Sequence, residues 1–78
     1  MICKLSRKDL RAEAIRLNAE TISRANIYDY ENERGKLCHD NGWGYHGYAY
    51  AEGTYGNIGR IDEICDSEGK TVKFVYWA

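Results

Sequence analysis

Two cysteines and two histidines are the side chains of this sequence best suited to binding a metal ion. Cys38 and His39 are adjacent, while His46 and Cys65 lie on later segments. Structural zinc sites usually take paired ligands with spacings such as C-x₂-C, because a tight turn then presents both to one ion. Adjacent residues on a strand point to opposite faces of a sheet. The spacing argues against zinc, and we expect neither a metal nor another cofactor.

Covalent and acid–base catalysis are the other chemistries that these residue types allow. Cys38 with His39 or His46 resembles a nucleophile and its base, but nothing brings them within hydrogen-bonding distance or supplies an oxyanion hole. One short segment gathers carboxylates, namely Asp62, Glu63, Asp66 and Glu68. Acid–base catalysis needs two groups with different pKa values, and the sequence shows no neighbour that would shift the pKa of one of these carboxylates relative to the others. We therefore expect a protein that is not an enzyme, with these acids on the exposed edge of a hairpin.

The segment from Gly42 to Gly47 reads G-W-G-Y-H-G and matches the glycine spacing of dinucleotide-binding loops. That fingerprint requires a preceding parallel strand and a following helix. The residues after Gly47 alternate as a strand does, so we reject nucleotide binding for this segment.

Aromatic residues and glycines are interspersed through residues 42–59. Tyrosine offers a large contact area with few rotamers, and glycine lets the backbone adapt, which is why antibody loops combine them. We expect a partner-binding set composed of Trp43, Tyr45, Tyr48, Tyr50 and Tyr55. The competing interpretation is that alternate tyrosines pack beneath a helix while the glycines only form turns.

A second hypothesis has the same aromatic residues stack on nucleobases while basic residues hold the phosphates. The basic residues in question are Lys4, Arg7, Lys8 and Arg11. The aromatic segment itself is neutral or acidic and the pI of the chain is about 6.1, whereas nucleic-acid footprints are usually strongly basic. Single-stranded nucleic acid is therefore the alternative partner.

The chain of 78 residues has the size of a single domain, residues 1–78, and a net charge of −1. Its charge is uneven, with a basic N-terminal third and an acidic middle, which suits steering toward a charged partner. The cysteines, Cys3, Cys38 and Cys65, are odd in number and far apart. Without a signal peptide or a long apolar run, this pattern indicates a cytoplasmic protein with reduced thiols and no membrane partner, although a Cys38–Cys65 bridge stays open.

The clearest local element is a helix from residue 7 to about residue 24. Ser6 is placed to cap it, with Asp9 in the capping-box position, and Leu10 and Ala14 begin an apolar stripe. Alternating patterns predict strands over residues 1–5, 26–31, 36–39, 44–51, 57–65 and 70–77. The expected fold is α+β, with one N-terminal amphipathic helix packed on an antiparallel sheet of four or five strands.

In layout the chain resembles small phage-encoded inhibitors of host defence, and some anti-CRISPR proteins in particular. The resemblance rests on the helix SRKDLRAEAIRLNAE and the strands GYHGYAYAEG, NIGRIDEIC and KTVKFVYWA, without a shared signature motif. It implies a stoichiometric inhibitor, acting in the host cytoplasm, that binds a Cas effector complex or nuclease with exposed acids and tyrosines. The leading hypothesis is a binding module, monomeric or homodimeric, that occupies a surface of a larger protein or ribonucleoprotein.

Overall fold

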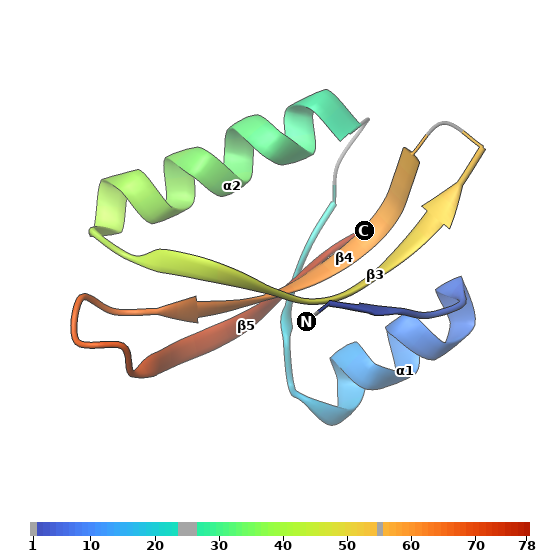
Figure 1. Cartoon of the computed structure of the whole chain (residues 1–78), viewed down its shortest axis with the longest axis horizontal. Coiled ribbons are helices and arrows are strands. Elements are labelled where there is room, and N and C mark those ends of the chain that lie inside the picture. Colours follow the sequence, from blue (N-terminus) through green and yellow to red (C-terminus); the bar gives the residue numbers. More distant parts are fainter. Residues whose placement is uncertain (1, 24–26, 55) are drawn as a thin grey trace.

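The computed structural model describes residues 2–23, 27–54 and 56–78 and shows one sheet with a helix on each face (Figure 1). Along the chain the elements are β1 (Cys3–Lys4), α1 (Arg7–Arg16), β2 (Glu20–Ile22), α2 (Ile27–Asn41), β3 (Gly44–Gly53), β4 (Gly56–Cys65) and β5 (Thr71–Trp77). The predicted α+β class is confirmed, with a second helix that the sequence pattern did not reveal.

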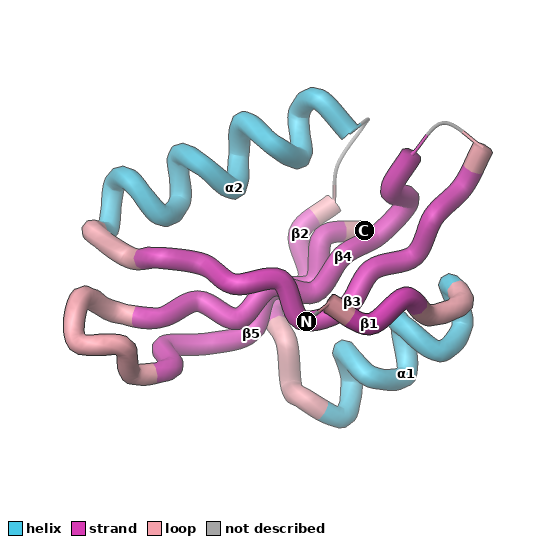
Figure 2. The backbone as a smooth tube through the Cα atoms, in the orientation of Figure 1, coloured by secondary structure: helices cyan, strands magenta, loops and turns pink. Residues whose placement is uncertain are grey.

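The sheet is mixed rather than antiparallel. Its five strands follow the order β1-β3-β4-β5-β2, and the central strands β3, β4 and β5 form antiparallel pairs as predicted. Both short edge strands, labelled β1 and β2 in Figure 2, run parallel to their neighbours. Parallel pairs need a crossover connection, and the path from β1 to β3 supplies one because it contains α1, β2 and α2. Edge strands this short carry no pattern that reveals their direction.

Helix α2 occupies the region where the alternation predicts two strands, over residues 26–31 and 36–39. Its buried residues Tyr30, Arg34 and Cys38 are each four positions apart, which is the spacing of a helix face. Gly35 lies on the exposed side of the helix with open space around its Cα. A glycine inside a helix costs about 1 kcal/mol relative to alanine, and burial of the opposite face outweighs that cost.

Helix α1 begins as predicted. The Ser6 hydroxyl accepts a hydrogen bond from the Asp9 amide at 3.1 Å, which satisfies one of the free amides of the first turn. Leu5, just before the cap, packs against the cluster that contains Leu10, as a hydrophobic staple requires.

The end of α1 comes at Arg16, earlier than the apolar periodicity predicts. Asn18 adopts a left-handed backbone with a φ of 54°. Its amide donates to the Ile15 carbonyl at 3.0 Å, and the Ala19 amide donates to the Ala14 carbonyl at 2.9 Å. This is the Schellman arrangement, in which asparagine is the usual substitute for glycine. It turns the chain out of the helix and into β2.

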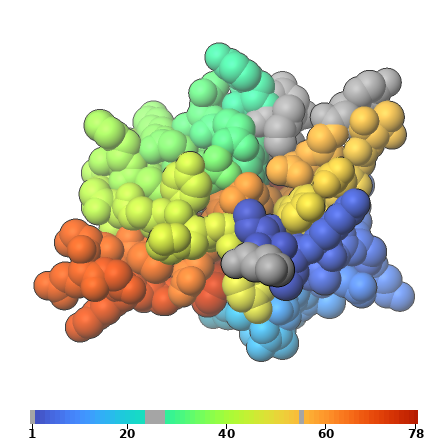
Figure 3. Space-filling model, in the orientation of Figure 1, coloured from blue at the N-terminus to red at the C-terminus, as the bar shows by residue number. Residues whose placement is uncertain are grey.

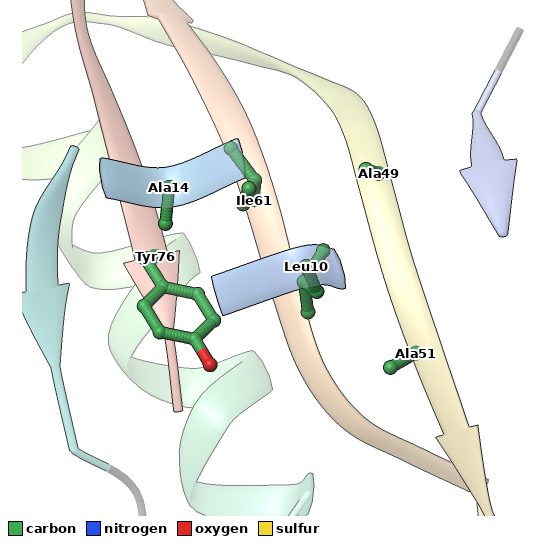
Figure 4. Close-up of a cluster of buried hydrophobic side chains, with 6 residues drawn as sticks. All are labelled: Leu10, Ala14, Ala49, Ala51, Ile61 and Tyr76. Atoms are coloured by element: carbon green, nitrogen blue, oxygen red, sulfur yellow. The ribbon is translucent and has the colours of Figure 1, made fainter. Parts of the chain in front are cut away.

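Each helix buries one face of the sheet. The cluster beneath α1 consists of Leu10, Ala14, Ala49, Ala51, Ile61 and Tyr76 (Figure 4). The cluster beneath α2 consists of Tyr30, Cys38, Ile64, Val75 and Trp77. The predicted alternation along β5 is confirmed, because Tyr76 lies in the first cluster while Val75 and Trp77 lie in the second.

The two helices carry opposite charge. Helix α1 has four basic and two acidic side chains, whereas α2 has four acidic and two basic ones. Because the sheet separates them, the molecule presents a basic face and an acidic face. Such a charge layout orients a charged partner during encounter.

Candidate partner-binding site

The predicted aromatic set divides between the two faces of the sheet. Trp43 packs against the cluster beneath α2. Tyr45 and Tyr50 belong to the same face, because the residues opposite them in β4 and β5 lie on the α2 side. Tyr48 instead packs against the cluster beneath α1, and Tyr55 lies outside the described residues. Trp43, Tyr45 and Tyr50 therefore share the α2 face, but Tyr50 lies five residues beyond Tyr45, where β3 pairs with Lys4 of β1.

The outer edge of β3 is uncovered over its first residues. Strand β1 pairs with β3 only at Ala49 and Tyr50, and no described strand lies outside Gly44–His46. Tyr45 keeps 39% of its surface exposed. In Figure 3 this part of β3 reaches the surface between α2 and the β4–β5 turn. An open strand edge offers unpaired amide and carbonyl groups to another chain.

We call this region the edge surface. It consists of Trp43, Tyr45 and the backbone of Gly44–His46.

Two cationic side chains make cation–π contacts with the aromatic rings of the edge surface. The Arg34 guanidinium lies 4.3 Å from the centre of the Tyr45 ring, and the Lys73 ammonium lies 5.5 Å from that of Trp43. Lys73 Nζ also lies 2.5 Å from a carboxylate oxygen of Glu20. Contacts of this kind contribute about 0.5–2 kcal/mol each. They orient the rings before a partner arrives, which reduces the entropy lost on binding.

Tyr48 has a role inside the fold. Its hydroxyl donates to Glu13 at 2.7 Å and accepts from Arg16 at 3.2 Å, and its ring meets Phe74 edge-on at 5.5 Å. The hydrogen bonds from Arg16, and next from Tyr48, lower the pKa of Glu13 to about 2. These contacts tie α1 to β3, so a change at Tyr48 would alter the fold together with any binding surface.

Asp62 corrects the prediction of an exposed acidic hairpin. Its side chain is 0% exposed beneath α2. Arg60 Nε donates to Oδ1 at 2.6 Å, and the Trp77 indole donates to Oδ2 at 2.9 Å. The Tyr30 hydroxyl also donates to Oδ2, at 3.4 Å. A buried carboxylate needs such partners, and Asp62 therefore organises the core and cannot contact another molecule directly.

Arg34 connects this buried network to the edge surface. It is only 8% exposed, and its NH1 lies 3.9 Å from Asp62 Oδ2. Its NH2 forms an ion pair with Glu31, while Nε and NH1 make no hydrogen bond within the described chain. The sequence pattern left Arg34 between the strands predicted over residues 26–31 and 36–39 and gave it no role. The signal that would have found it is the four-residue spacing from Tyr30 to Arg34 to Cys38.

The remaining predicted acids lie near the β4–β5 turn. The Asp66 carboxylate accepts hydrogen bonds from the amides of Glu68 and Lys70, at 2.9 and 3.0 Å. It therefore shapes the turn, as aspartate commonly does. Glu63 accepts a hydrogen bond from the Thr71 hydroxyl at 2.5 Å, and Glu68 is exposed. Of the four predicted acids only Glu68 is fully exposed, whereas Glu63 and Asp66 are half-buried.

The basic residues of the nucleic-acid alternative lie on and beside α1. Lys4 approaches Glu52 at 4.0 Å, and exposed positions on α1 are occupied by Arg7, Lys8 and Arg11. The edge surface belongs to the opposite face of the sheet. A nucleic-acid strand whose bases stack on the aromatic residues and whose phosphates contact the basic residues requires both groups along one groove. In this fold the two groups lie on opposite faces of the sheet.

The thiols do not form the bridge left open by the sequence. Cys38 and Cys65 are free and buried, and Cys3 is free and exposed. Burial raises the pKa of Cys38, which makes it a poor nucleophile, and the neighbouring His39 side chain points to solvent.

The described residues contain no group of three or more metal-binding side chains. None of the helices in the described chain has the length and apolarity to cross a membrane.

Tyr30 is expected to make stability pH-dependent in alkaline solution. Burial, and next the Asp62 carboxylate, raise the pKa of Tyr30 above its ordinary value of 10.0. A group whose pKa is higher in the folded state stabilises the fold below its unfolded pKa, and this contribution is lost as the pH rises further. We expect the free energy of unfolding, measured with urea from neutral pH to about pH 11, to decline above about pH 10.

Two conservative variants test this assignment. Tyr30→Phe should show a flatter alkaline decline, whereas Tyr28→Phe, at an exposed position of the same helix, should keep the wild-type profile. Equal declines in wild type and Tyr30→Phe would refute the role of Tyr30.

Comparison with protein-family models, with curated proteins and with solved structures finds no match for this chain.

Proposed function

We propose that this protein is a non-enzymatic binding module that occupies a surface of a larger protein or ribonucleoprotein through the edge surface. The observation that carries the proposal is the uncovered outer edge of Gly44–His46 beside the half-exposed ring of Tyr45. Natural proteins usually protect such edges with lysine, proline or a covering segment. Here the edge carries glycine, tyrosine and histidine instead, which suits pairing with another chain.

The proposed mode is strand addition. An extended segment of the partner pairs with the backbone of Gly44–His46, and its side chains pack on Trp43 and Tyr45. Main-chain hydrogen bonds then supply affinity while the aromatic contacts supply specificity. The glycine at position 44 keeps the approach to the backbone open.

The partner class follows from the resemblance in layout, which implies a CRISPR–Cas effector complex. The acidic α2 lies beside the edge surface and would meet a basic, nucleic-acid-binding face of such a complex. Occupation of that face would inhibit the complex without any catalysis by this protein. Charge complementarity of this kind mainly raises the association rate.

The test compares two variants, each of which replaces one glycine by lysine. Gly44 and Gly35 both have open space where a side chain would begin and neither has a positive φ, so lysine fits at each. Gly44→Lys places a charge at the uncovered edge of β3, and Gly35→Lys places the same charge on the outer side of α2. Affinity capture from bacterial lysate, with and without nuclease, compares both variants with the wild type.

A stoichiometric protein that survives nuclease, binds wild type and Gly35→Lys, and is lost from Gly44→Lys would support the proposal. Retention of the same partner by Gly44→Lys would reject the edge surface. Recovery of nucleic acid, with proteins released by nuclease, would instead favour the alternative through Lys4, Arg7, Lys8 and Arg11.

A further inference from the structure

At the opposite edge of the sheet, no strand of the described chain lies outside β2. Strand β2 ends the sheet order and pairs in parallel with β5, with Thr21 opposite Tyr76. The Ile22 carbonyl accepts a hydrogen bond from the Ala78 amide at 3.0 Å, so the backbone groups of Ile22 point toward β5. Because these directions alternate along a strand, the amide and carbonyl of Thr21 point outward.

A basic groove of about 560 Å³ lies on the α1 side of β2, and Arg7, Arg11, Asn18, Thr21 and Tyr76 are among the residues that line it. Arg7 and Arg11 are one helical turn apart and both are exposed. Neither forms a hydrogen bond or an ion pair within the described chain. Paired guanidinium groups beside hydroxyls fit a carboxylate.

A smaller hollow of about 210 Å³ lies on the α2 side of the same strand. Its apolar lining comes from Ile22, Leu37 and Trp77, and its charged lining includes Glu33 and Lys36. The hollow has room for one bulky apolar side chain, which would bury its surface against the indole and the aliphatic groups.

The two hollows are related by the geometry of a strand. Thr21 lines the basic groove and the next residue, Ile22, lines the smaller hollow. A strand added alongside β2 would likewise direct consecutive side chains to opposite faces. One would enter the basic groove and the next would enter the apolar hollow.

We propose that the β2 edge binds an extended peptide segment in which an acidic residue is directly adjacent to a bulky apolar residue. The acid pairs with Arg7 and Arg11, the apolar side chain fills the hollow beside Trp77, and the Thr21 backbone pairs with the peptide. This surface is separate from the edge surface of β3, and its occupant need not belong to the same partner.

The test is fluorescence anisotropy with labelled synthetic peptides. The probe carries glutamate followed directly by leucine within a threonine-rich, extended host sequence. In a register control one threonine separates the two residues, which places both side chains on one face. We expect the adjacent peptide to bind about tenfold more tightly than the spaced peptide, because only the adjacent peptide places glutamate in the basic groove and leucine in the apolar hollow at the same time.

Two charge reversals on α1 provide the matched protein controls. Arg11→Glu, which lines the groove, should weaken the adjacent peptide by about tenfold or more. Lys8→Glu, an exposed position that is not among the groove residues, should change affinity by no more than about twofold. Gly44→Lys should also bind like the wild type, which separates this site from the edge surface. Equal binding of the two peptides, no binding, or equal effects of Arg11→Glu and Lys8→Glu would overturn the inference.

Discussion

Asp62→Ala is expected to lower the free energy of unfolding by about 3–5 kcal/mol, the cost of removing one partner from a buried ion pair. The carboxylate is the shared acceptor for Arg60 and for the Trp77 indole, and it faces the guanidinium of Arg34. Alanine would remove the carboxylate that these groups share and leave a space beneath α2. Small domains are stable by about 5–15 kcal/mol, so the variant would be close to unfolding at room temperature.

Urea denaturation followed by circular dichroism measures this loss, and two further variants define its origin. Asp62→Asn keeps an oxygen acceptor for Trp77 but removes the charge. We expect its free energy of unfolding to lie between those of the wild type and Asp62→Ala. Glu68→Ala, in the exposed turn, should stay within about 0.5 kcal/mol of wild type. A loss below about 1 kcal/mol for Asp62→Ala would mean that Asp62 behaves as a surface acid, as the sequence alone indicated.

Leu10→Ala is the second large expected effect, at about 2–5 kcal/mol of stability lost. Leu10 is 0% exposed and is the largest side chain that α1 inserts into the cluster above β4. Its removal takes apolar surface out of the core and leaves a cavity that a small sheet cannot close fully. The exposed Ile15 on the same helix is the control, since Ile15→Ala should change stability by no more than about 0.5 kcal/mol.

A double-mutant cycle tests whether Leu10 sits where the structure places it. A Cβ added at Gly59 would lie 3.0 Å from Leu10 Cδ2, so Gly59→Ala crowds the helix in the wild-type background. In Leu10→Ala the same methyl group would enter the vacated space. We expect Gly59→Ala to cost less stability in Leu10→Ala than in wild type, a departure from additivity that contacting residues show. Equal costs would show that Leu10 and Gly59 are not in contact.

The candidate site was predictable only in its residue types. The glycine and tyrosine pattern of residues 42–59 marked strand β3. Trp43 and Tyr45 lie beside the uncovered part of its edge, whereas Tyr50 lies where β1 pairs with it, opposite Lys4. The same pattern could not show that Tyr48 is bonded to Glu13. A period of two assigns residues to two faces, but it does not say which neighbour covers each face or which edge is left open.

By itself, the sequence determined the features that depend on a few neighbouring residues. The Ser6 cap, the alternation along β5 and the turn shaped by Asp66 and Gly69 are local, because each rests on contacts within one or two turns of the chain. Only the tertiary structure decided that residues 27–41 form a helix, that both edge strands run parallel, and that Asp62 is buried. Those outcomes depend on packing between segments far apart in the chain, and burial against a distant partner outweighs a local preference of about 1 kcal/mol.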